Sequence, residues 1–306
     1  MAQIVTFDVP SSHGTSPAAI NIQREITGSY TDASGSSHGF LRKRNGSIVQ
    51  FDPPNAKNTS PVGINESGQI AGWYSDGSGG GKGFLRRHNG VIVTFELPNS
   101  TQTIPTAINS DGEISGHYGD SSGPSHGFLR KRNGSFVTFD IANSTETSPN
   151  DITHAGVTAG QWGDVSGHLH GFLRDHQGGV ATFDVPNSAS TTAMAITNAH
   201  RIMGRYTDAS GQAQCFVRQP NGTIVKITIP GATSATGWAV NSAGDIVGVW
   251  TDAAGAHSFL RGANGSITAI DIAGATYTQP VGVNHAGDIA GYFGDASGGT
   301  HGFLRS

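Results

Sequence analysis

Gly83-Phe84-Leu85-Arg86 is followed by the turn Asn89-Gly90 and then by Ile92-Val93-Thr94-Phe95, and this stretch predicts a β-hairpin. Asn-Gly between two apolar runs is a strong hairpin signal because both residues tolerate positive φ. The pattern recurs along the whole 306-residue chain, with one Phe at the same position of each copy. These Phe residues, spaced by 44, 44, 44, 44, 43 and 44 positions, are Phe40, Phe84, Phe128, Phe172, Phe216, Phe259 and Phe303. The chain is therefore a repeat protein.

Each copy contains four short apolar runs separated by turn residues. In the second copy these runs are Pro61–Asn65, Gln69–Tyr74, Gly83–Arg86 and Ile92–Phe95. Four strands that recur about every 40–50 residues are typical of a β-propeller blade, and helical periodicity is absent. The copies fill residues 1–306, so we expect a single domain without a linker.

The two ends of the chain complement each other. The N-terminal stretch from Met1 to Phe7 predicts a strand, and Ile4–Asp8 matches the fourth strand of a copy whose other strands are missing. The last copy stops after Phe303-Leu304-Arg305 and lacks that fourth strand. Pairing the two ends would leave no open sheet edge. The sequence thus predicts an all-β, seven-bladed β-propeller with four antiparallel strands per blade, closed by the N-terminal strand against the C-terminal strand.

The hairpin turns also predict a strand register. If Asn45-Gly46 is a two-residue turn, Phe40 faces Phe51 and Gly39 faces Asp52. The same rule pairs Phe7 with Phe303. In the fifth copy, the residue equivalent to the glycine is Cys215 and the facing acid becomes threonine, which suggests that these two positions touch.

Composition excludes several classes of protein. The net charge is −4 and the pI is about 6.3, so no global field attracts nucleic acid or an anionic membrane. No stretch approaches the roughly 20 apolar residues of a membrane span. The single cysteine, Cys215, excludes an intrachain disulfide and a cysteine-based zinc site, and we expect it to be a packed core thiol.

A family resemblance rests on three recurring motifs. His-Gly-Phe-Leu-Arg occurs at 38–42, 126–130, 170–174 and 301–305, with Ile-Asn-x-x-Gly before it and Tyr/Trp-x-Asp between them. The chain resembles the HAF-type bacterial extracellular repeat family over its whole length. The resemblance implies a propeller-like, often exported protein and carries no catalytic residues. We expect an extracellular or periplasmic protein, with any signal peptide outside this sequence, and leave a cytoplasmic location open.

Recurring polar residues have structural explanations. We expect each histidine of the third strand to bond to the recurring aspartate of its own blade, since these histidines are spread around a ring and do not converge on one metal ion. We therefore expect no metal and no cofactor. The histidines are His38, His126, His170, His257 and His301, and the aspartates are Asp32, Asp120, Asp164, Asp252 and Asp295. The Asp-x-Ser-Gly loops are turn-formers without the alternating acids of a calcium loop.

Basic residues gather near the Asn-Gly turns of the early copies. The extra residues are Lys43, Arg44, Arg87, Lys131 and Arg132. No aromatic residues interleave with them, so a single-stranded nucleic acid is not the expected partner.

Three sets of equivalent positions vary strongly between copies. The first precedes the aromatic of strand two: Ser29, Trp73, His117, Gln161, Arg205, Val249 and Tyr292. The second opens strand one: Ala18, Val62, Thr106, Asn150, Met194, Trp238 and Val281. The third lies between blades: His13, Lys57, Gln102, Glu146 and Tyr277. Strands one and two form a hairpin, so we expect all three sets on one face, around the mouth of the channel, where a rigid scaffold presents binding residues.

These sets suggest one asymmetric site for a single small-molecule or glycan ligand in a monomer. We expect catalytic roles for His117, Tyr292, Arg205 and Asp151, with Arg205 or His117 as the partner of Asp151. Ligand contacts are expected from Trp73, Gln161, Trp238, Asn150, Tyr277, Lys57, His13 and Glu146. Stacking aromatics, Arg205 and an acid–base pair favour lyase-like β-elimination on an acidic glycan. Hydrolysis would need two facing carboxylates, for which Asp151 and Glu146 offer little basis. A multivalent lectin and a protein-interaction scaffold are the alternatives.

Overall fold

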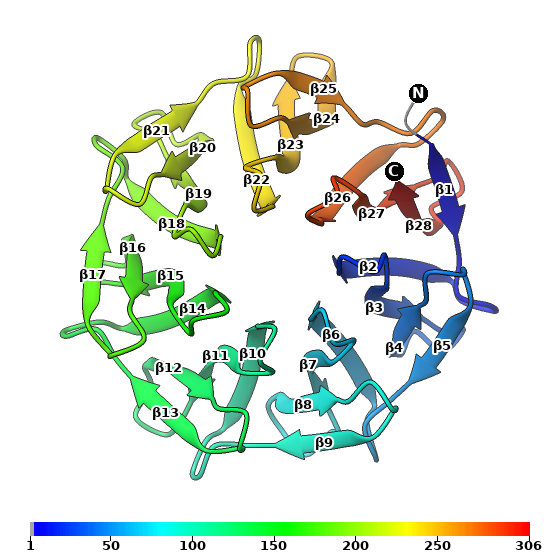
Figure 1. The fold of residues 1–306 in the computed structure, drawn as a ribbon, viewed down its shortest axis with the longest axis horizontal. Coiled ribbons are helices and arrows are strands. Elements are labelled where there is room, and N and C mark those ends of the chain that lie inside the picture. The colour runs from blue at the N-terminus through cyan, green and yellow to red at the C-terminus, as the bar shows by residue number, and fades with distance from the viewer. Residues whose placement is uncertain (1–2) are drawn as a thin grey trace.

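The computed structural model describes residues 3–306, which form 28 β-strands and no helix. The strands stand in a ring (Figure 1). Within a blade the neighbouring strands pair antiparallel, and 28 strands fit seven blades of four. The all-β, propeller-like class predicted from the repeats is confirmed. Of the predicted N-terminal strand, Ile4–Phe7 is β1, whereas Met1 and Ala2 lie outside the described residues.

The strands occupy four equivalent places in the blades. The first strands, toward the centre of the ring, are β2 (Gly14–Ile20), β6 (Asn58–Ile64), β10 (Gln102–Ile108), β14 (Glu146–Ile152), β18 (Ser190–Ile196), β22 (Ser234–Val240) and β26 (Tyr277–Val283). The second strands are β3 (Ile26–Thr31), β7 (Ile70–Ser75), β11 (Ile114–Gly119), β15 (Thr158–Gly163), β19 (Ile202–Thr207), β23 (Ile246–Asp252) and β27 (Ile289–Gly294). The third strands are β4 (Ser37–Arg42), β8 (Lys82–Arg86), β12 (Ser125–Arg130), β16 (Leu169–Arg174), β20 (Ala213–Arg218), β24 (Gly255–Arg261) and β28 (Thr300–Arg305). The outer strands are β5 (Ile48–Phe51), β9 (Ile92–Phe95), β13 (Phe136–Phe139), β17 (Val180–Phe183), β21 (Ile224–Ile227), β25 (Ile267–Ala269) and β1 (Ile4–Phe7).

The N-terminal strand takes the outer place of the last blade. β1 pairs antiparallel with β28, with Ile4 opposite Arg305 and Phe7 opposite Gly302. The predicted pairing of the first and last strands is therefore confirmed. Single parallel pairs also link neighbouring blades in two places, Gly14 with Thr300 and Ser125 with Glu146.

The predicted register within the outer hairpins is wrong by one residue. Lys43 N donates to Ser47 O at 2.8 Å and Gly46 N donates to Lys43 O at 2.9 Å, while Gly46 has φ +87°. This is a three-residue loop closed by a glycine bulge, a second hairpin geometry that Asn-Gly also fits. Phe51 consequently faces Gly39, and Phe40 faces Gln50.

The other pairings that followed from the two-residue turn are corrected in the same way. Phe7 faces Gly302 and not Phe303. Asp52 does not face Gly39. It comes opposite His38, whose Nδ1 lies 2.8 Å from Asp52 Oδ2.

The corrected register explains why glycine recurs in the third strand. A Cβ atom at Gly39 would lie 2.7 Å from Cε2 of Phe51, so the aromatic ring occupies the space that a side chain at the glycine would need. In the fifth blade the glycine is replaced by Cys215, and the residue opposite is Ile227 instead of phenylalanine. Where the glycine is replaced by a residue with a side chain, the phenylalanine opposite it is therefore replaced as well.

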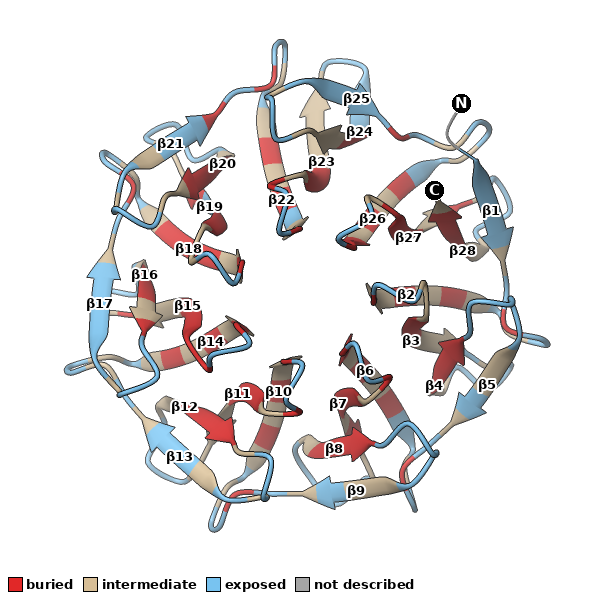
Figure 2. Cartoon of the chain, viewed as in Figure 1, coloured by how far each residue is buried: buried red, intermediate tan, exposed pale blue. Residues whose placement is uncertain are grey.

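The same aromatic residue connects neighbouring blades. Phe51 of the first blade meets Phe84 of the second edge-to-face, with ring centroids 6.1 Å apart. The Arg86 guanidinium lies 5.0 Å above the Phe51 ring and is buried. Phe7 makes the equivalent contacts with Phe40 and Arg42. Third strands are largely buried and outer strands exposed (Figure 2), so the core consists of layers between blades.

Cys215 is fully buried and packs near Met203 and Ile227. Burial raises the pKa of its thiol to about 12, so the group stays protonated at neutral pH. The predicted core thiol is confirmed.

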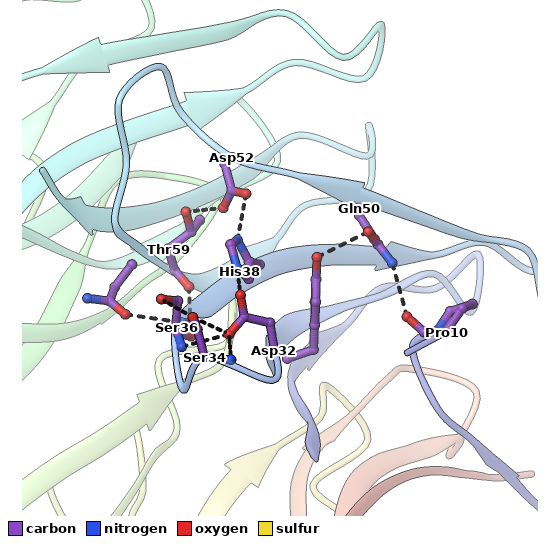
Figure 3. A network of polar contacts seen from close by, with 11 residues as sticks. Pro10, Asp32, Ser34, Ser36, His38, Gln50, Asp52 and Thr59 are labelled. Atoms are coloured by element: carbon purple, nitrogen blue, oxygen red, sulfur yellow. Dashed lines mark hydrogen bonds and ion pairs between the residues drawn. The ribbon is translucent and has the colours of Figure 1, made fainter. Parts of the chain in front are cut away.

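The recurring histidines bridge two carboxylates. In the first blade, His38 Nε2 lies 3.2 Å from Asp32 Oδ2, as predicted, and its Nδ1 contacts Asp52 (Figure 3). Asp32 Oδ1 also accepts hydrogen bonds from the backbone N–H groups of Ser34 and Ser36, which confirms the loop as a turn-former. Thr59 of the next blade donates to Asp52, so the network reaches the neighbouring blade.

His301 gives the fold a predicted pH dependence. The hydrogen bond to Asp8 is the main cause that raises the pKa of the His301 imidazole above 6.5, and the hydrogen bond to Asp295 is the second. A raised histidine pKa contributes stability that is complete below pH 6.5 and is lost as the pH rises through the folded-state value. We expect His301→Gln to flatten the decline of unfolding free energy above pH 6.5, measured by urea titration at several pH values. An unchanged decline would contradict this assignment.

Gly39→Ala should destabilise the protein by about 1–3 kcal/mol because the new methyl group overpacks the Phe51 ring. Phe51→Ile should also be destabilising. The double variant, which imitates the Cys215–Ile227 pair, should cost less than the sum of the two single changes by about 1 kcal/mol. Denaturant unfolding measures all three free energies. Additive effects would mean that the glycine is not required by the ring.

Candidate functional site

Each first strand carries a bulge at the second variable set. The register of β10 shifts between Pro105 and Ala107, which leaves Thr106 unpaired in the ladder. Thr106 Oγ1 donates to Pro149 O of the next blade at 2.7 Å, and Asn150 Nδ2 donates in the same way to Ala193 O at 2.8 Å. Side chains of this set thus extend toward the first strand of the neighbouring blade.

The third variable set does not reach the mouth of the channel, contrary to the prediction. The first strands run inward from the rim of the ring (Figure 1), so Glu146 and Tyr277, which begin β14 and β26, start at the outer end. His13 and Lys57 precede their strands and are exposed, and Lys57 Nζ lies against Gly77 of its own blade. The prediction failed because hairpin adjacency does not reveal the slant of a strand relative to the axis.

The first and third sets meet within individual blades. Gln161 Nε2 donates to Glu146 Oε1 at 2.9 Å. Tyr277 packs edge-to-face on Tyr292, with centroids 6.2 Å apart and an interplanar angle of 81°, and its hydroxyl lies 3.2 Å from Thr300 Oγ1. Burial is the main cause of a raised pKa at Tyr292, and the neighbouring Tyr277 raises it further. The phenol of Tyr292 therefore stays protonated at neutral pH.

One cavity combines variable residues from three consecutive blades. It has a volume of about 270 Å³ and is lined by Ala18, Trp238, Gln279, Val281 and Tyr292. Trp238 is 37% exposed and comes from the sixth blade, whereas Ala18 belongs to the first. An indole, a phenol and one amide around a small hollow suit a flat or ring-shaped ligand that also forms hydrogen bonds.

Gln279 was not selected by the sequence analysis. Its equivalents in the other blades are mostly small: Ser16, Ser60, Ile104, Ser148, Thr192 and Thr236. Comparison of the copies could have identified Gln279, because its long amide side chain replaces the mostly small residues of the other blades.

His117 forms a second group of functional side chains. Its Nδ1 lies 3.2 Å from Ser148 Oγ of the fourth blade. Burial lowers the pKa of His117 despite the opposing influence of Glu146, so the imidazole is neutral at pH 7. A neutral imidazole can accept a proton.

Asp151 is tied to the backbone. Its two carboxylate oxygens accept hydrogen bonds from Ile152 N and Ile196 N, each at 2.8 Å. Burial raises its pKa to about 6, and these two hydrogen bonds oppose the rise. The expected partners Arg205 and His117 do not provide these contacts, because amides on the free edges of adjacent first strands are closer. Arg205 is exposed.

The four expected catalytic residues are not assembled. His117 lies on β11 and Tyr292 on β27, in blades on opposite sides of the ring (Figure 1). The cavity beside Tyr292 is not lined by His117, Arg205 or Asp151. Trp73 lies apart from it as well, beside Gly81, which Ile104 of the third blade also approaches. Of the predicted ligand residues, Trp238 lines the cavity together with Tyr292, and Tyr277 packs on Tyr292.

A second cavity, of about 250 Å³, lies along the Asn-x-x-Gly turns at the inner ends of the first strands. Asparagines of these turns link neighbouring blades: Asn65 Nδ2 donates to Asn109 O at 3.0 Å, and Asn284 Nδ2 donates to Asn21 O at 3.1 Å. These amides are therefore engaged in structure.

Within residues 3–306, no group of three or more histidine, cysteine, aspartate or glutamate side chains is arranged to hold a metal ion. The same residues contain no helix with the length and apolar character needed to cross a membrane.

Comparison with solved structures places the chain in the propeller class. Virginiamycin B lyase from Staphylococcus aureus is 15% identical with a TM-score of 0.67, and the match covers 100% of both chains. The β-propeller domain of the Trilobed protease from Pyrococcus furiosus is 11% identical with a TM-score of 0.71, covering 98% of this chain and 95% of that one. A variant of the Aleuria aurantia lectin with Fucα1-6GlcNAc is 12% identical with a TM-score of 0.50, covering 85% and 96%.

At these identities the likeness shows the fold alone. No family model and no curated protein matches the sequence. The chain is thus an all-β protein of propeller-like architecture, and its function has to be argued from its own side chains.

The raised pKa of Asp151 predicts a stability difference that depends on pH. A carboxyl with a raised folded-state pKa favours folding below its ordinary value of 3.8, and this contribution is lost as the pH rises through about 6. Asp151→Ala, which installs the residue found in most other blades, should remove this loss. We compare the unfolding free energies of the variant and the natural protein in urea at pH 4 and pH 7.5. The difference should shift in favour of the variant at the higher pH, by on the order of 1–3 kcal/mol. An equal gap at both pH values would contradict the assignment.

Proposed function

We propose that the 28 strands form seven blades in one closed ring, and that this ring is a carbohydrate-binding protein with a single asymmetric site. The site is the cavity between the sixth, seventh and first blades. The pairing of β1 with β28 supports the closure. The exported location implied by the HAF-type resemblance and the expected monomeric state belong to the same proposal.

The observation that carries this function is the meeting of Trp238 and Tyr292 at one cavity of about 270 Å³. Both residues occur at positions where other blades carry unrelated side chains, so the combination is found once in the ring. The volume is just below the roughly 300–1,000 Å³ of pockets for drug-sized molecules, which suits one sugar ring. Gln279 supplies an amide that can donate and accept hydrogen bonds.

Trp238→Ala should weaken binding of the best ligand in a panel of neutral and acidic oligosaccharides by about 2 kcal/mol, roughly 30-fold in Kd. The expected loss is large because a half-exposed indole supplies most of the apolar surface for stacking. Isothermal titration calorimetry provides the affinity and the stoichiometry.

Trp73→Ala is the matched control, because it removes an indole from the first variable set outside the cavity. It should leave the affinity unchanged, and the stoichiometry of the natural protein should be near one. Several equal sites would support a multivalent lectin instead, and equal losses in both variants would reject the cavity as the site.

A second candidate function is lyase-like β-elimination on an acidic glycan, which the neutral, half-buried His117 favours. In this proposal His117 takes the proton next to the uronate carboxylate, the electron pair forms the carbon–carbon double bond, and the glycosidic oxygen leaves and takes a proton from water. Glu146, held by Gln161, increases the basicity of the imidazole.

His117→Ala should lower the rate of unsaturated-product formation from oligouronates about 100-fold, the usual contribution of one general base. Tyr292→Phe should retain turnover, since Tyr292 lies on the opposite side of the ring. The absorbance of the unsaturated sugar is the readout. Absence of turnover in the natural protein on a panel of polyuronates would leave binding as the function, and full turnover by His117→Ala would eliminate His117 as the base.

A further inference from the structure

A groove between the second and third blades has an unbalanced positive charge. Its cavity of about 330 Å³ is lined by Gln69, Arg87, His88, Asp111, Gly112 and Arg132, among others. An adjoining cavity of about 180 Å³ shares Gln69, His88, Asp111 and Arg132. Both hollows lie along the Asn-Gly and Asn-x-x-Gly turns, so they are separate from the cavity at Trp238.

The next groove around the ring shows how such a charge is normally balanced. Between the third and fourth blades, Lys131 Nζ lies 3.1 Å from Glu113 Oε1. The position of Lys131 is occupied by Arg87 in the second blade, and that of Glu113 by Gln69. The basic residue is thus retained while its carboxylate becomes a neutral amide. Gln69 extends across the groove, since a Cβ atom at Gly112 would lie 2.7 Å from its Oε1.

The charged neighbours of the buried arginines differ from groove to groove in the same way. Burial lowers the pKa of Arg86, and Glu25 opposes that shift, while Asp175 does the same for Arg174. For Arg130, burial lowers the pKa and the neighbouring cation Arg87 lowers it further. Nε and Nη1 of Arg130 are also buried without a hydrogen-bond partner. Arg87 and Arg132 thus line the groove, and Arg87 lies close enough to the buried Arg130 for the two positive charges to interact.

Asp111 is the carboxylate that lines the groove. Its side chain is 51% exposed, and its Oδ2 lies 3.7 Å from Nδ1 of His154 in the fourth blade. One half-exposed carboxylate faces two guanidinium groups and an imidazole, so the groove keeps a net positive charge.

We propose that this groove binds an oxyanion, a carboxylate or sulfate group, carried by an acidic carbohydrate, with Arg87, Arg132 and His88 as its ligands. Guanidinium groups suit such oxyanions because they form paired, charge-assisted hydrogen bonds. The statement that a carbohydrate carries the oxyanion rests on the proposed function, whereas the binding of an oxyanion in this groove does not. Equivalent positions in later blades carry Asp175, Gln219 and Gly262, so the site is confined to the early blades.

The favoured polymer is a glycan and not a nucleic acid. No Phe, Tyr or Trp side chain lines either hollow, so the broad ring faces on which bases usually stack are missing.

The test replaces Gln69 by the acid that the next groove contains. Inorganic sulfate is titrated into the full-length protein at low ionic strength, followed by thermal unfolding and calorimetry. The natural protein should be stabilised by sulfate, and Gln69→Glu should weaken sulfate binding about tenfold or more because the new carboxylate takes the place of the anion. Arg87→Gln should have the same effect.

Glu113→Gln is the matched control, since it removes the corresponding carboxylate one blade further on. It should not weaken sulfate binding and should add a weaker second site at Lys131. Equal sulfate affinity in the natural protein and Gln69→Glu, with circular dichroism showing both folded, would overturn the proposal.

A second series identifies the source of the oxyanion. An oligogalacturonate or a sulfated oligosaccharide should bind more tightly than single-stranded DNA of equal charge, with the difference lost in Gln69→Glu. Tighter binding of the DNA would overturn the carbohydrate assignment. Trp238→Ala should keep its sulfate affinity while losing its neutral-sugar affinity, so failure of this proposal and failure of the proposed function are distinguishable.

Discussion

The contact between an outer-strand phenylalanine and a third-strand glycine determines how the blades assemble. Because the glycine has no side chain, the ring of Phe51 lies directly on the backbone of Gly39 and reaches Phe84 and Arg86 of the next blade. One residue thus forms part of its own hairpin and of the layer between blades. Similar contacts join Phe7 to Phe40 and Arg42, which makes the N-terminal strand part of the same system.

A scaffold held by repeated contacts can vary at positions that do not take part in them. The bulge position of the first strand is one example: its side chain extends to the next blade and is Ala18 in one copy and Trp238 in another. The cavity exists because a large side chain at one bulge meets small ones at the following two, Val281 and Ala18. Differences between neighbouring copies, more than the identity of any single residue, create the hollow.

The period and the alternation of turns and apolar runs predicted the propeller class and the partner of the N-terminal strand. The register was missed because Asn-Gly fits a two-residue turn and also a three-residue loop, and no local signal separates them. Co-variation of Cys215 with the outer strand was a true signal, although the residue opposite is Ile227. Site geometry was harder to predict, because the slant of the first strands and the free backbone amides that bind Asp151 follow from the assembled ring.

The buried arginines have two effects that act in opposite directions. Each guanidinium lies on a phenylalanine ring, which offsets part of the cost of burying a charge with some N–H groups unbonded. A ring face compensates the desolvation of the cation but leaves its net charge in place. Where Glu25 or Asp175 is nearby, that charge is balanced by the protein. The charged group that acts on the pKa of Arg130 is another arginine, Arg87, so the buried guanidinium that joins the second and third blades adds to the positive charge beside the groove between them.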